Sequence, residues 1–66
     1  MHLTVNGELR DVPEEVTLAG LMQSLGLKPE LTAVQRNDDI VSRDEHATTI
    51  LLEGDTIELI RIVGGG

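Results

Sequence analysis

The spacing of apolar residues along the chain changes from alternation to a helical repeat and back to alternation. Leu3 and Val5 alternate with polar residues. The Asn-Gly pair at 6–7 then favours a type I′ hairpin turn, because both central positions of that turn need a positive φ. A strand should therefore return over residues 8–12. Further strands are predicted over residues 31–36, 40–41 (short) and 56–63 (the longest).

A helix is predicted between the second and third strands. From Leu18 to Leu25, large apolar residues recur at intervals of three and four positions, which places them on one face of a helix. Thr17 precedes the segment as an N-cap, and Gly26 follows it where a glycine commonly ends a helix. Gly20 costs about 1 kcal/mol relative to alanine within a helix, so we expect close packing at that point.

The second half of the chain contains shorter signals. Residues 42–45 fit the S-x-x-E capping box, which predicts one helical turn near residues 44–46. Residues 48–52 should be irregular or briefly extended, and residues 53–55 should form a turn. The resulting order of elements is typical of an α+β domain, a mixed sheet of about five strands with one main helix on one face.

The last predicted strand does not keep a polar outer face along its whole length. Ile57 and Leu59 share one face, whereas Ile60 and Ile62 lie on the other, with Val63 adjoining them. These three residues are either ordinary exposed aliphatic side chains or a patch that docks a partner protein.

Composition excludes several functions. The 66 residues suffice for one domain, over residues 1–63, with a flexible glycine-rich tail at 64–66. The chain has no aromatic residue and a net charge of −7, which argues against binding nucleic acid or an anionic membrane. It also has no cysteine, and no basic, apolar signal segment at its start. We therefore expect a cytoplasmic protein that is a monomer when free.

Candidate catalytic and metal-binding residues are weak. His2 and His46 have no companions at ligand spacing, so no metal site is expected. The acid pairs at 38–39 and 44–45 lie in turn-like stretches, where solvated carboxylates are usual. Ser42 suits an N-cap better than a nucleophile. No glycine-rich phosphate loop precedes a helix, so we expect no bound cofactor.

The glycine run at 64–66 has two interpretations. It is either an unstructured end or linker, or a thread that enters a narrow tunnel, because residues without Cβ atoms allow close approach to another backbone or a nucleotide. In the second interpretation Gly64 and Gly65 pass through the tunnel and bring the carboxylate of Gly66 to its end.

Together these features resemble the sulfur-carrier proteins of thiamin biosynthesis (the ThiS family), a branch of the ubiquitin-like β-grasp proteins. The resemblance covers the whole chain. It depends on the following segments: 6–7, 17–25, 33–37, 40–43, 53–55 and 60–66.

The resemblance implies a β-grasp fold and a protein that is a co-substrate of other enzymes, not itself an enzyme. An ATP-dependent (E1-like, ThiF-type) enzyme would adenylate the carboxylate of Gly66, and sulfur from cysteine, supplied through a cysteine desulfurase, would convert it to a thiocarboxylate. Thiazole synthase (ThiG-type) would receive that sulfur. Both enzymes would dock on Ile60, Ile62 and Val63. The tripled glycine leaves open whether Gly66 or Gly65 is the acceptor.

Other functions use the same kind of chain end. One alternative is a sulfur carrier for molybdopterin or tRNA thiolation, or a ubiquitin-like protein modifier. Another is an interaction module whose glycines are a linker. The short length and the absence of aromatic residues favour the thiamin carrier.

Overall fold

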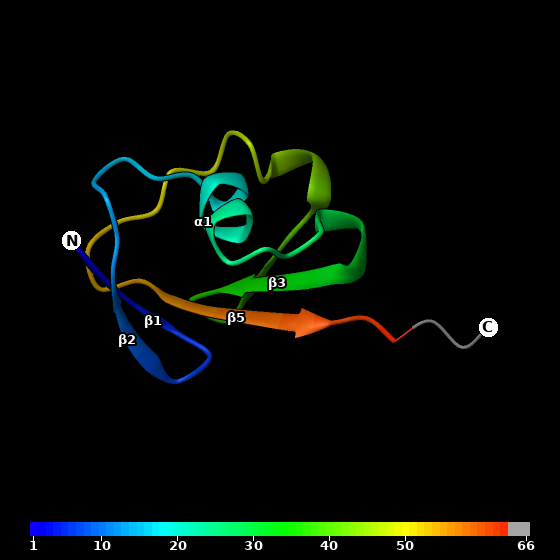
Figure 1. The fold of residues 1–66 in the computed structure, drawn as a ribbon, viewed down its shortest axis with the longest axis horizontal. Coiled ribbons are helices and arrows are strands. Elements are labelled where there is room, and N and C mark those ends of the chain that lie inside the picture. Colours follow the sequence, from blue (N-terminus) through cyan, green and yellow to red (C-terminus); the bar gives the residue numbers. More distant parts are fainter. Residues whose placement is uncertain (64–66) are drawn as a thin grey trace.

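The computed structural model describes residues 1–63, so the predictions for Gly64, Gly65 and Gly66 lie outside the described residues. In chain order the elements are β1 (His2–Val5), β2 (Glu8–Asp11), α1 (Leu18–Ser24), the 3₁₀ helix η1 (Pro29–Leu31), β3 (Thr32–Arg36), β4 (Asp39–Val41), the 3₁₀ helix η2 (Arg43–Glu45) and β5 (Thr56–Arg61). Figure 1 shows α1 lying over one face of the sheet. This confirms the predicted α+β arrangement.

The five strands form one mixed sheet in the order β2-β1-β5-β3-β4. β5 therefore lies in the middle of the sheet, although it is the last strand in sequence. It runs parallel to β1, with Thr4 opposite Thr56, and antiparallel to β3, with Ala33 opposite Ile60. Because β1 pairs only with the first two residues of β5, the C-terminal end of β5 is paired on the side of β3, and the chain leaves the sheet from there.

The core lies between α1 and the facing side of the sheet. Within it, β5 contributes Ile57 and Leu59, as its alternation predicts. Burial of one such side chain is worth about 1.5–3 kcal/mol, so the aliphatic core can stabilise the domain without any aromatic residue. The other buried apolar residues are Leu3, Val5, Leu18, Leu21, Met22, Val34 and Leu51.

The ends of α1 agree with the sequence signals. Thr17 Oγ1 accepts a hydrogen bond of 3.0 Å from the N–H of Gly20. At the other end Gly26 has φ +71°, and the N–H groups of Gly26 and Leu27 bond back to the carbonyls of Gln23 and Met22, which is a Schellman cap. A Cβ atom on Gly20 would lie 3.3 Å from Val16 Cγ2, so the expected close packing is confirmed.

The hairpin turn is also confirmed. Asn6 and Gly7 have φ values of +51° and +80°, as a type I′ turn requires.

Three local predictions are corrected. Leu31 belongs to η1 and not to β3, because Pro29 starts a 3₁₀ turn immediately before the strand. β5 ends at Arg61 and not at Val63. Arg61 lies opposite Thr32, the first residue of β3, and the residues before Thr32 belong to η1 and cannot extend the strand pairing. Ser42 precedes η2, but its hydroxyl donates to Glu45 Oε1 at 2.8 Å and caps no backbone N–H.

Candidate functional site

The chain leaves the sheet through an exposed aliphatic segment. Ile60, Ile62 and Val63 have exposed fractions of 51%, 50% and 86%, and we call them the β5 apolar patch. Ile60 lies on the face of the sheet opposite α1, as the alternation of β5 predicts. Exposure of all three side chains is thus established, whereas their role in docking stays a prediction.

The β5 apolar patch is attached to the sheet on the side of β3. Ile60 lies opposite Ala33, and the N–H of Ile62 donates to the carbonyl of Leu31 at 2.8 Å, one residue beyond the end of the strand. On the same face of the sheet, the preceding cross-strand pair is Glu58 with Gln35. The outer face therefore changes from polar to aliphatic close to the point where the chain leaves it.

A surface hollow of about 200 Å³ lies beside the same end of β5. Two of the five basic residues of the chain, Lys28 and Arg61, line it. The remaining lining residues are Gly26, Leu27, Leu31 and Thr32. Sequence reasoning missed this hollow, because the strand register that places Arg61 opposite the first residue of β3 is not visible in the sequence.

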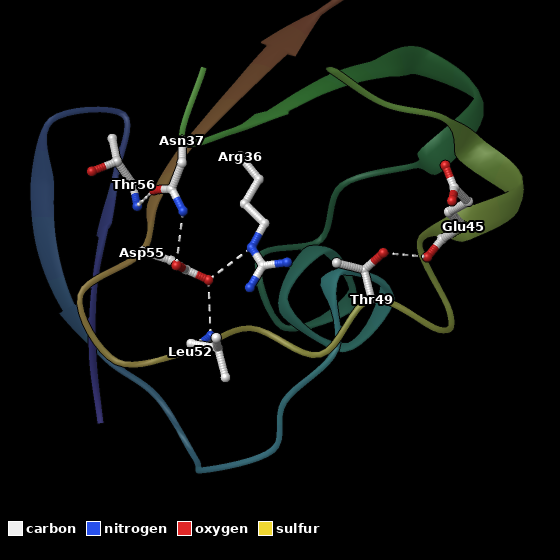
Figure 2. Close-up of polar contacts among 7 residues, drawn as sticks. All are labelled: Arg36, Asn37, Glu45, Thr49, Leu52, Asp55 and Thr56. Carbon is white, nitrogen blue, oxygen red and sulfur yellow. Dashed lines mark hydrogen bonds and ion pairs between the residues drawn. The ribbon is translucent and has the colours of Figure 1, made fainter. Parts of the chain in front are cut away.

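The most connected polar cluster lies at the start of β5 (Figure 2). Asp55 is only 6% exposed, and its carboxylate accepts hydrogen bonds from Arg36 Nε at 2.8 Å, Asn37 Nδ2 at 3.0 Å and the N–H of Leu52 at 2.8 Å. Asn37 Oδ1 accepts in turn from the N–H of Thr56 at 2.9 Å. The cluster joins the end of β3 to the beginning of β5. Because the Asp55 carboxylate accepts hydrogen bonds from three donors, its role is structural.

These contacts also set the protonation of Asp55. Burial acts to raise the pKa of the carboxyl, but the hydrogen bonds from Leu52, Asn37 and Arg36, together with the charge of Arg36, outweigh burial and hold the pKa below its ordinary value. Asp55 is therefore ionised at neutral pH, paired and unsuited to accept or release a proton.

The other polar candidates do not form a catalytic arrangement within residues 1–63. The hydroxyl of Ser42 is bonded to Glu45, and His46 is buried with its Nε2 3.3 Å from the carbonyl oxygen of Val41. Asp38 is exposed in the turn between β3 and β4, and Asp39 is exposed at the start of β4 rather than in the turn. The Ser42–Glu45 pair is exposed to solvent, and the recorded contact of His46 Nε2 is with a backbone carbonyl and not with either partner, so these groups do not form a catalytic relay.

Two negative findings concern residues 1–63, the part of the chain that the structure describes. Its His, Asp and Glu side chains nowhere gather in a group of three that could hold a metal ion. Its helices are all too short and insufficiently apolar to cross a membrane.

Comparison with known proteins gives a consistent picture. A sequence profile of the ThiS family matches residues 3–66. A thiazole synthase from Magnetococcus marinus is 41% identical over 66 residues, which is 100% of this chain and 20% of that protein. The chain thus spans about a fifth of that relative's length. The sulfur carrier protein ThiS of Bacillus subtilis is 32% identical over 50 residues, or 76% of each chain.

A solved structure matches the whole chain. The crystal structure of a thiamine biosynthesis protein (ThiS) from Geobacter metallireducens shares 30% identity, with a TM-score of 0.86 over 100% of both chains. The β-grasp fold expected from the sequence is confirmed by this match and by the observed sheet order.

Proposed function

Since this chain belongs to the ThiS family, we propose that it is a sulfur carrier for thiazole synthesis and that the carboxylate of Gly66 is the group that carries the sulfur. The main supporting observation is the position of the β5 apolar patch. Three exposed aliphatic residues lie immediately before the glycine run, at the end of the central strand.

The proposed chemistry takes place on the carrier, while other proteins supply the catalysts. An ATP-dependent adenylating enzyme joins the Gly66 carboxylate to AMP, because a free carboxylate is a poor acyl group and AMP is a good leaving group. The outer sulfur of a desulfurase persulfide, which originates from cysteine, then attacks the acyl carbon and expels AMP. A thiol reductant cleaves the S–S bond of the resulting acyl disulfide and leaves the thiocarboxylate. The carrier binds no cofactor, and ATP is bound by the adenylating enzyme.

The proposed recipient of the sulfur is a thiazole synthase. The similarity to the thiazole synthase of Magnetococcus marinus supports this choice, since in that relative a ThiS-like segment is part of a longer protein of that name. Both enzymes would grip the β5 apolar patch while Gly64 and Gly65, which have no side chains, enter the active site.

The proposal predicts a change of mass. When the protein is incubated with ATP, cysteine, a cysteine desulfurase, a thiol reductant and the thiamin-type adenylating enzyme, its intact mass should rise by about 16 Da, because one oxygen is replaced by sulfur. Intact mass spectrometry measures this directly, and fragmentation assigns the mass to Gly66 or Gly65. Omission of ATP is the control.

Two outcomes would contradict the proposal. If the adenylating enzyme modifies an established carrier and leaves this protein unchanged, the carrier role is wrong. If only the molybdopterin-type enzyme converts it, the protein is a carrier of a different pathway.

A further inference from the structure

β5 continues well beyond the point where β1 leaves it. β1 pairs with β5 only at Thr4 and Val5, after which the N–H of Asn6 bonds to the carbonyl of Ile57 at 2.9 Å and the chain turns away. Backbone groups alternate in direction along a strand. Since Ile62 bonds toward β3, the N–H and C=O of Leu59 point to the side that β1 has vacated.

The side chain of Asn6 occupies that place. Its Oδ1 accepts a hydrogen bond of 2.7 Å from the N–H of Leu59, and its Nδ2 donates to the carbonyl oxygen of Leu59 at 3.3 Å. One amide thus makes both bonds that a neighbouring strand residue would make. Glycine would satisfy the φ of +51° at this position equally well, but it has no side chain with which to bond Leu59.

Leu59 is the last residue of β5 for which the structure records a backbone hydrogen bond on the side of β1, and it lies opposite Val34 of β3 on the other side. Its side chain is 8% exposed and belongs to the core. The next residue, Ile60, begins the β5 apolar patch, where the backbone bonds that the structure records lead to β3 alone. The two bonds from Asn6 therefore hold the edge of β5 that β1 leaves open, directly before the residues through which the chain leaves the sheet.

We propose that Asn6 is a positioning residue for the sulfur-transfer reaction, because its amide fixes Leu59 and thereby aims the chain end at the active site of the adenylating enzyme. The inference rests on the proposed function. The turn residue Asn6 thus has a second role, because its side chain bonds Leu59 of β5, which lies 53 positions away in sequence.

The test compares Asn6→Gly with Asn37→Gly. Both asparagines have a left-handed backbone that glycine tolerates, and both bond β5 through their side chains. Asn37, however, bonds at Thr56, where β5 begins. Loss of either amide should lower the thermal midpoint, while only the loss of Asn6 should alter the end of the strand.

For Asn6→Gly we expect the kcat of thiocarboxylate formation to fall about tenfold, since a misdirected acyl group reaches the reactive geometry less often. KM for the carrier should change less than kcat, because the β5 apolar patch is intact. Hydrogen exchange at the Leu59 amide should accelerate, while exchange at Thr4, which bonds Asp55, stays as in the wild type. Asn37→Gly should keep the wild-type kcat.

The inference is overturned if Asn6→Gly keeps the wild-type kcat or the slow exchange of Leu59, or if Asn37→Gly loses as much kcat as Asn6→Gly. Failure of the proposed function looks different, because the wild-type protein itself then gains no sulfur whichever residue is present at position 6.

Discussion

Asp55 shows how a single residue can join distant parts of a small domain. Arg36 and Asn37 lie 19 and 18 positions before it, and its carboxylate bonds both side chains as well as the N–H of Leu52. Since hydrogen bonds to a charged group are worth about 1.5–3 kcal/mol each and an unpaired buried donor is costly, this residue should matter to stability.

Replacement of Asp55 should therefore destabilise the protein. Asp55→Asn removes the charge that Arg36 pairs with, and we expect the free energy of unfolding at pH 7 to fall by about 1–3 kcal/mol. Urea denaturation measures the loss. Glu14→Gln, in an exposed loop, is the matched control and should leave stability unchanged. A neutral effect of Asp55→Asn would show that the cluster contributes nothing net.

The same residue predicts a pH dependence. The pKa of Asp55 is lower in the folded protein than its ordinary value of about 4. Its stabilisation is therefore fully present above pH 4 and is lost as the pH falls through the lower, folded value. Asp55→Asn should lack this part of the acid dependence, so the stabilities of variant and wild type should converge at low pH. A constant difference at all pH values would contradict the assignment.

At the level of elements, α1 depends on its ends and its packing. It has seven residues, fewer than the ~12–15 that an isolated helix needs for stability in water. The Thr17 cap, the Gly26 turn and the buried face of Leu18, Leu21 and Met22 compensate for its length.

Gly26 allows a test of the helix end without a packing change. A Cβ atom at Gly26 would meet nothing within 4 Å, so Gly26→Ala should destabilise only through its φ of +71°, by about 1–2 kcal/mol. Gly26→Asn, which tolerates this conformation better, should lose less. Thermal denaturation compares the two. Equal losses would indicate that the conformation of residue 26 is not the cause.

Such local signals explain what the sequence could predict. α1 and the first hairpin were predicted because Thr17, Gly26 and Asn6 act within a few residues of themselves. The end of β5 was misplaced because it depends on where β3 stops. The Asp55 cluster and the bond from Asn6 to Leu59 join residues up to 53 positions apart, and no periodicity reports such pairs.

At the scale of the whole molecule, we expect the charged surface and the exposed aliphatic residues to act at different steps of partner binding. The chain has a net charge of −7, yet two of its basic residues, Lys28 and Arg61, lie beside the end of β5. Complementary charge on a partner mainly raises the association rate, whereas buried aliphatic contacts hold the complex. Docking by the proposed enzymes should therefore depend more on the β5 apolar patch than on salt.

Ile62→Asp tests this docking role. Since the side chain is half exposed, the thermal midpoint should stay close to that of the wild type, while KM for the carrier in the adenylation reaction should rise about tenfold. Leu9→Asp makes the same change at an exposed residue of β2, at one edge of the sheet, and should leave KM unchanged. Equal KM values for the two variants would contradict the docking role.

The central position of β5 also has a consequence for biosynthesis. Because the last strand lies between β1 and β3, ribosomal synthesis must pass residue 61 before the sheet can close. β1 pairs with the neighbouring β2, but its second partner, β5, lies more than fifty residues downstream. Such distant pairings slow folding, as contact order predicts. A prematurely terminated chain would lack both the middle of its sheet and the surface proposed for enzyme recognition, so sulfur would be loaded only onto finished carriers.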